Sequence, residues 1–141
     1  MKNLKPLIIL LAEDNVDHAE LIIGSLKDFN VANEIVHVNN GEEVLSYLCD
    51  TSHTDRKPNL ILLDLKMPRM NGTKALEEIR KLPEYKKTPV IMLSTSSIDK
   101  DIDDCYVLGA NSYLTKPLGF EEFTKKIQDL NIYWVLTAEM P

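Results

Sequence analysis

Acidic side chains follow two of the apolar segments in this chain of 141 residues, and their positions suggest chemistry with a cation. Glu13 and Asp14 come directly after the run 7–12, and Asp64 directly follows the run 60–63. A carboxylate at the end of a buried strand either caps the turn that follows or belongs to a site. Clustered carboxylates suit Mg²⁺, which prefers oxygen ligands. A bound divalent ion would also let acids lie close together that would otherwise raise one another's pKa.

Hydroxyl groups and a lysine follow two further apolar segments. Ser94 and Thr95 come after the run 89–93, and Lys116 comes after the run 111–115. Lysine supplies a compact positive charge for a phosphate oxygen, and serine or threonine supplies a hydroxyl donor. An ionised aspartate beside a metal can attack phosphorus and form an aspartyl phosphate. Together these groups suffice for reversible capture of a phosphoryl group, and the set contains no base placed for fast turnover on an external substrate.

Each of these residues also has an ordinary interpretation when it is taken alone. Acids before a helix are most often solvated or act as caps, and Asp64 could equally cap the next turn. Lys116 by itself is more often a surface lysine, and Ser94 and Thr95 are common types at strand ends. It is their joint placement on one edge of a sheet that favours the functional interpretation.

The elements that must position these residues alternate between strand and helix. Short apolar runs predict strands over residues 7–12, 34–38, 60–63, 89–93 and 111–115. Five strands alternating with five helices predict an α/β domain with a parallel sheet, and right-handed crossovers make it doubly wound. In such sheets a ligand binds beyond the carboxyl ends of the strands, where all the candidate residues lie.

Helix starts and helix ends are visible in the sequence as well. Asn15 is a plausible N-cap, and Asn40 with Glu43 forms a start like a capping box. A third helix begins at about Gly72, and Gly109 is expected to end the fourth. The expected buried faces of the last two helices carry Ile98, Ile102 and Cys105, and Phe120, Phe123, Ile127 and Leu130.

Composition places the chain among soluble globular proteins. The length predicts one domain over residues 1–141, with a core at about 7–130 and a tail at 131–141. The net charge of −6 argues against non-specific nucleic-acid binding, which needs a basic face. The first apolar run is too short for a signal peptide or a membrane span, so we expect a cytoplasmic protein that contacts neither nucleic acid nor membrane.

The cysteines and histidines show no spacing typical of metal ligands. Cys49 and Cys105 fall within helical patterns and are expected to be small core residues in a reducing compartment. His18, His37 and His53 are expected at a helix start, in a strand and in a loop, without a further role.

Four stretches of this chain, in this order, resemble the signature stretches of bacterial response-regulator receiver domains. They are "LLAEDN", "LILLDLKMPRMNG", "PVIMLSTS" and "GANSYLTKPL", and the match runs roughly from Leu7 to Leu130. Any one of them alone would be a weak signal, whereas the four together are highly specific. The resemblance implies a flavodoxin-like receiver fold with strand order 2-1-3-4-5, in which the first and third strands are neighbours.

The resemblance also implies roles for particular residues. Asp64 would be the phosphoacceptor, Asp14 and the backbone carbonyl of Lys66 would bind Mg²⁺ with it, and Glu13 would hold a metal-bound water. Lys116 would pair with the phosphoryl group.

Two residues have structural roles by the same resemblance. The Lys116–Pro117 bond would be cis, which only X–Pro bonds adopt at low cost. Gly72 would be a structural residue at its helix start.

Signal switching and signal lifetime involve further positions. From the strand pattern alone, either Ser94 or Thr95 could be the switch hydroxyl. Family spacing from Gly109 selects Ser94, and Tyr113 would be the aromatic side chain that swings inward with it. Residues two past the acceptor and two past the switch hydroxyl flank the path of attacking water, and here they are Lys66 and Ser96. Because neither is an amide or carboxylate that orients water well, we expect slow self-dephosphorylation.

Other functional classes fit the residues less well. A dinucleotide-binding enzyme needs a glycine-rich turn after the first strand, and "LLAEDNVDHAE" has none. A haloacid-dehalogenase-like phosphatase wants a second aspartate two positions after its nucleophile, and that position is Lys66. The serious alternative is a pseudo-receiver that serves only as a binding scaffold. Such proteins usually lack the acceptor or its acids, and all are present here.

Output by protein contacts is expected because only "NIYWVLTAEMP" remains after the last predicted helix. The chain is therefore expected to be a stand-alone receiver, not an enzyme, whose donor is a histidine kinase, a hybrid kinase or a phosphotransfer protein. The loop before Pro58 and the chain's ending resemble, more loosely, the subgroup that partners phytochrome-like kinases. The apolar group Tyr133 to Leu136 favours a homodimer through the last helix and tail.

Overall fold

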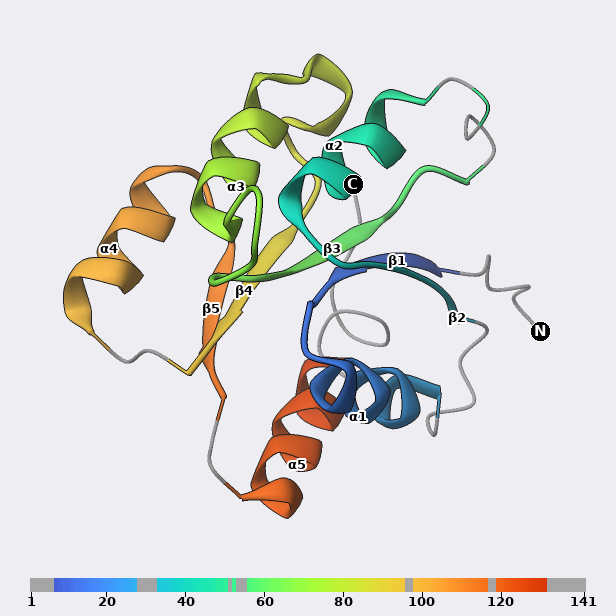
Figure 1. The fold of residues 1–141 in the computed structure, drawn as a ribbon, viewed down its shortest axis with the longest axis vertical. Coiled ribbons are helices and arrows are strands. Elements are labelled where there is room, and N and C mark those ends of the chain that lie inside the picture. Colours follow the sequence, from blue (N-terminus) through green and yellow to red (C-terminus); the bar gives the residue numbers. More distant parts are fainter. Residues whose placement is uncertain are drawn as a thin grey trace.

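The computed structural model describes residues 7–27, 33–50, 52, 56–95, 98–116 and 119–131. Within these residues, strands and helices alternate along the chain from blue to red in Figure 1. The elements are β1 Leu7–Ala12, α1 Val16–Lys27, β2 Asn33–Val38, α2 Gly41–Cys49, β3 Leu60–Asp64, α3 Gly72–Lys81, the 3₁₀ helix η2 Pro83–Tyr85, β4 Val90–Ser94, α4 Asp99–Val107, β5 Ser112–Thr115 and α5 Phe120–Asn131.

The strands form a parallel sheet in the order β2-β1-β3-β4-β5 (Figure 1). From β1 the chain goes first to β2 on one side and then to β3 on the other, so the strand order reverses between β1 and β3. The register places Ala12 opposite Leu63, and Asp64 opposite Leu93. The predicted order and the doubly wound α/β class are confirmed.

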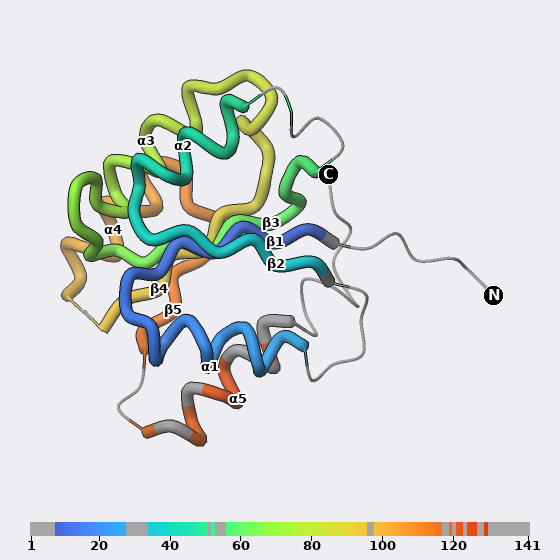
Figure 2. Tube along the Cα trace, turned by 45° about the vertical axis from the view of Figure 1, so that its right-hand side comes forward, coloured from blue at the N-terminus to red at the C-terminus, as the bar shows by residue number. Residues whose placement is uncertain are grey.

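Helices cover both faces of this sheet. In Figures 1 and 2, α2, α3 and α4 lie on one face, while α1 and α5 lie side by side on the other. In the described part of the chain, no helix combines the length and the apolar character that crossing a membrane requires.

The sheet divides the core into two halves. Successive residues of a strand point to opposite faces, so the central strands contribute to both. Leu63 packs in the half that contains residues of α2 and α3, whereas its neighbour Leu62 packs with Ala19, Ile22 and Leu26 of α1. This explains why the central strands are uninterrupted apolar runs.

Polar caps begin the helices at the edge of the sheet where the candidate residues lie. The side-chain oxygen of Asn15 accepts the N–H of His18 at 3.0 Å, and that of Asn40 accepts the N–H of Glu43 at 2.9 Å. Both predicted caps are confirmed. The Glu43 carboxylate accepts from the N–H of Asn39 at 3.3 Å, so the bond that would close a capping box is shifted by one residue.

Two predictions about buried residues are wrong. Cys49 is exposed, because it follows the buried Leu48 and its side chain is therefore turned by about 100° around α2. Ile98 is 64% exposed, because it is the N-cap residue before α4 and not part of the helix's buried face. Cys105 is buried as predicted. Gly109 has φ of 106° and directly follows Leu108, the C-cap residue of α4, as expected of a helix-ending glycine.

Candidate functional site

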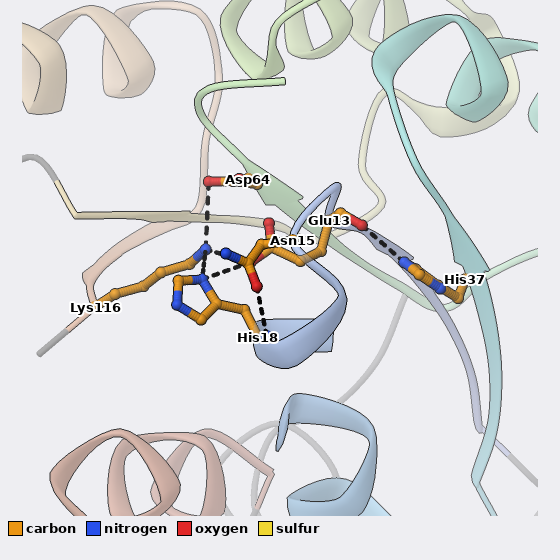
Figure 3. A network of polar contacts seen from close by, with 6 residues as sticks. All are labelled: Glu13, Asn15, His18, His37, Asp64 and Lys116. Atoms are coloured by element: carbon orange, nitrogen blue, oxygen red, sulfur yellow. Dashed lines mark hydrogen bonds and ion pairs between the residues drawn. The ribbon is translucent and has the colours of Figure 1, made fainter. Parts of the chain in front are cut away.

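The carboxyl ends of four neighbouring strands bring the predicted site residues to one edge of the sheet. Asp64 is the last residue of β3, and Ser94 is the last residue of β4. Glu13 and Asp14 follow β1, and Lys116 follows β5. Figure 3 shows the side chains of Lys116 and Asp64 pointing toward each other, close to Glu13. The sequence therefore predicted this grouping correctly from strand ends alone.

Lys116 places a charged ammonium group inside this edge. The residue is only 6% exposed. Its Nζ forms an ion pair with Glu13 and lies 3.5 Å from Oδ1 of Asp64. A buried ammonium is stable only when acceptors surround it, and these carboxylates provide them.

Glu13, Asp14 and Asp64 form a cluster of oxygen ligands. One carboxylate oxygen from each lies within 4.8 Å of the others. Glu13 and Asp64 are buried, whereas Asp14 is exposed. The second carboxylate oxygen of Glu13, Oε2, is buried and has no hydrogen-bond partner among the described residues. An all-oxygen set with a buried unpaired oxygen fits a hard divalent cation such as Mg²⁺.

The local environment changes the acidity of Asp64. Burial is the main cause, and together with the neighbouring carboxyl group of Glu13 it raises the pKa of Asp64 to about 7, against the opposing effect of Lys116. Without a cation, this cluster therefore retains a proton near neutral pH. Positive charge added at the cluster favours the ionised form of Asp64.

The turn after Asp64 depends on a close approach at Gly72. The N–H of Gly72 donates to the carbonyl of Leu65 at 2.9 Å, which brings the start of α3 against the end of β3. A Cβ at Gly72 would lie 2.2 Å from the carbonyl oxygen of Asp64. Only glycine fits this position without displacing the backbone of the site. Lys66, in the same turn, has an exposed side chain.

The two hydroxyl candidates occupy different environments. Ser94 is 1% exposed, whereas Thr95 is exposed and lies beyond the end of β4. The carbonyl of Ser94 accepts the N–H of Lys116 at 2.6 Å, so the backbones of these two site residues are joined. Tyr113 is half-buried on β5 and packs against the core half under α2, α3 and α4.

Two histidines lie at the site although no role was predicted for them from the sequence. Nδ1 of His18 lies 3.2 Å from Nζ of Lys116, and Nε2 of His37 lies 2.8 Å from the backbone carbonyl of Glu13 (Figure 3). Burial first, and then the charge of Lys116, lower the pKa of His18. The usable signal was position: His18 lies in the first turn after β1, and His37 lies near the carboxyl end of β2.

Some predicted positions lie outside the described residues. These are Ser96, Pro117 with its cis peptide bond, His53 and the tail from residue 132 to 141 with its apolar group.

Comparison with known proteins gives consistent matches over nearly the whole chain. A model of the response regulator receiver domain family matches residues 9–128. The response regulator Rcp1 of Synechocystis is 33% identical over 138 residues, which are 96% of this chain and 94% of Rcp1. The probable methanogenesis regulatory protein FilR2 of Methanothrix harundinacea is 35% identical over 131 residues, which are 92% of this chain and 84% of FilR2.

Solved structures agree with these sequence matches. The phosphorylated cyanobacterial phytochrome response regulator RcpA superimposes with a TM-score of 0.92 at 34% identity, covering 97% of this chain and 99% of RcpA. The Mn²⁺-bound form of Rcp1 superimposes with a TM-score of 0.90 at 33% identity, covering 96% of this chain and 99% of Rcp1.

Proposed function

Since the chain belongs to the response regulator receiver family, we propose that it signals by accepting a phosphoryl group on Asp64. The donor is a histidine kinase, a hybrid kinase or a phosphotransfer protein. The protein catalyses its own phosphorylation and dephosphorylation, and it passes the signal on through protein contacts.

The observation that carries this proposal is the position of the Asp64 carboxylate. It ends β3 at the carboxyl edge of the sheet, with two further acids beside it and the ammonium of Lys116 at 3.5 Å. A carboxylate held only as a cap would not need a buried ammonium or a neighbouring buried glutamate. This combination suits a nucleophile whose product carries additional negative charge.

Phosphorylation forms one bond and breaks another at the same phosphorus. A carboxylate oxygen of Asp64 attacks the phosphoryl group, and the bond from phosphorus to the donor breaks, leaving a histidine imidazole or, with acetyl phosphate, acetate. Lys116 neutralises a phosphoryl oxygen, and Ser94 donates its hydroxyl to another. The burial of Ser94 and its backbone link to Lys116 support Ser94 over Thr95 in this role.

Mg²⁺ belongs to the proposal as the cofactor. Asp14, Asp64 and the backbone carbonyl of Lys66 would hold it, and Glu13 would hold one of its waters through the unpaired Oε2. When bound, the ion neutralises the crowded carboxylates and polarises the phosphoryl oxygens. The existence of an Mn²⁺-bound form of Rcp1 supports the binding of a divalent ion by this chain.

The signal that follows phosphorylation is also part of the proposal. Ser94 moves toward the phosphoryl group and Tyr113 swings inward. Lys66 and Ser96 set a slow loss of the phosphoryl group.

The biological setting is inferred from the relatives. RcpA is a phytochrome response regulator, so we assign this chain a phytochrome-like or related hybrid kinase as its donor. We place the protein in the cytoplasm, acting as a single receiver domain that dimerises through its last helix and tail. Sedimentation with and without phosphorylation tests the dimer, and a monomer at high concentration in both states contradicts it.

Intact-mass measurement tests the central proposal directly. Incubation with acetyl phosphate and Mg²⁺ should add one phosphoryl group to the wild type and none to Asp64→Asn, which is nearly isosteric. Thermal unfolding of both proteins controls for folding. A folded wild type that takes no phosphoryl group would identify a binding scaffold, and full labelling of the Asn variant would place the acceptor elsewhere.

A further inference from the structure

The buried ammonium of Lys116 has a third possible acceptor nearby, in addition to its two carboxylate partners. A lysine ammonium carries three N–H donors, and each needs an acceptor when the group is buried. Glu13 Oε1 and Asp64 Oδ1 are ion-paired with it, and His18 Nδ1 lies at 3.2 Å (Figure 3). These atoms come from the loop after β1, the end of β3 and the first turn of α1, and together they hold the ammonium.

The protonation of the His18 ring determines which bond it can make. Nδ1 also lies 3.2 Å from Oε1 of Glu13, so a proton on Nδ1 would let the ring donate to that carboxylate. It would then face an N–H of Lys116 with another N–H, and Oε1 of Glu13 already accepts from Lys116. With the ring proton on Nε2, Nδ1 accepts from Lys116 instead. The second arrangement gives the Lys116 ammonium three acceptor atoms, one for each of its N–H donors.

We infer that His18 is a positioning residue: it accepts a hydrogen bond from Lys116 and so holds the lysine ammonium group beside the carboxylate of Asp64. The inference rests on the proposed function of Asp64 as phosphoacceptor. His18 does not touch the phosphoryl group. It restricts the rotation of the lysine side chain, so that the positive charge is already in place when a donor arrives.

Replacement of His18 by leucine and by asparagine separates this role from simple packing. Leucine fills space without an acceptor, whereas Oδ1 of asparagine stands at the same number of bonds from Cα as Nδ1 of histidine. The His18 side chain is 38% exposed, so both variants should fold. The loss of a hydrogen bond to a charged group changes an equilibrium constant by about tenfold. We therefore expect His18→Leu to slow phosphorylation by acetyl phosphate about tenfold, and His18→Asn to retain most of the wild-type rate.

A second measurement does not depend on phosphorylation. The ammonium signal of Lys116 in ¹⁵N NMR should exchange with water slowly in the wild type and in His18→Asn, and faster in His18→Leu. Glu20→Gln, an exposed change in the same helix, is the matched control and should leave both the rate and the exchange unchanged. If His18→Leu does not fold, His18→Ala replaces it, because alanine also lacks a side-chain acceptor.

The outcomes distinguish the two proposals. A leucine variant with wild-type rate and wild-type ammonium exchange overturns the role of His18, as do leucine and asparagine variants that are slowed equally. A wild type that takes no phosphoryl group refutes the function of Asp64 instead, and the NMR comparison still decides whether His18 holds Lys116.

Discussion

Replacing Gly72 with alanine should disturb the site without changing any of its functional groups. Gly72 begins α3, and its amide hydrogen bond to Leu65 brings it against the end of β3. The added methyl group would lie 2.2 Å from the carbonyl oxygen of Asp64 and 3.0 Å from Cα of Leu65. Carbon and oxygen atoms in contact are usually about 3.3 Å apart, so the strand end and the helix must separate by about 1 Å.

The size of the effect follows from this overlap. Overpacking against backbone that cannot move freely costs about 1–3 kcal/mol, and alanine in a helix recovers part of that. We expect the free energy of unfolding to fall by about 2 kcal/mol. For a domain of this length, the entropy of unfolding of about 0.3 kcal/mol/K converts that loss to a fall in Tm of about 7 °C.

Thermal and urea unfolding, with and without Mg²⁺, measure the effect. The displaced backbone carries Asp64, so the rise in Tm on adding Mg²⁺ should also shrink in Gly72→Ala. Gly24→Ala is the matched control: Gly24 lies within α1, and a Cβ there meets nothing within 4 Å. That variant should gain about 0.5–1 kcal/mol. A Gly72→Ala protein as stable as the wild type, beside a stabilised Gly24→Ala, would refute the close packing of α3 on β3.

Three further substitutions test the electrostatics and kinetics of the site. Burial raises the pKa of Asp64 from 3.8 to about 7, so the metal-free native protein holds a proton that the unfolded chain releases, and its stability falls as the pH rises through that window. The Tm of the metal-free wild type should therefore fall from about pH 4 to about pH 7 relative to Asp64→Asn, and parallel curves would contradict the raised pKa. Asp14→Ala should abolish the Mg²⁺-dependent shifts of nearby amide signals in NMR; an unchanged response would place the cation elsewhere. Lys66→Asn should speed the decay of the phosphorylated protein several-fold in a mass-spectrometric time course, because an amide orients water better than a lysine does. An unchanged or slower decay would show that Lys66 does not limit the loss of the phosphoryl group.

The sequence contained enough information to predict the fold and to bring Glu13, Asp14, Asp64 and Lys116 to one edge of the sheet. Apolar runs that stop at polar residues defined the strands, and the parallel α/β architecture then requires their ends to meet. Asn15 and Asn40 could be identified as caps because a helix cap depends on residues within one turn.

What the sequence could not supply were contacts between distant segments. His18 and His37 reach Lys116 and Glu13 across 98 and 24 positions of the chain, and no local pattern encodes either distance. The reason that Gly72 must be glycine is likewise visible only once β3 and α3 are packed together. Ile98 was misassigned because an apolar residue immediately before a helix continues the helical spacing without sharing the buried face.

The division of the core by the sheet has a consequence for how this protein can vary. Leu62 and Leu63 are neighbours in the chain, yet each packs into a different half of the core. The two halves have no buried residue in common, so substitutions on opposite faces at positions more than about 10 Å apart should have additive effects, with a coupling energy near zero. Repacking under α1 can then proceed without compensating changes under α2 and α3. The two helical layers can drift independently in sequence while the edge that carries Asp64 remains fixed between them.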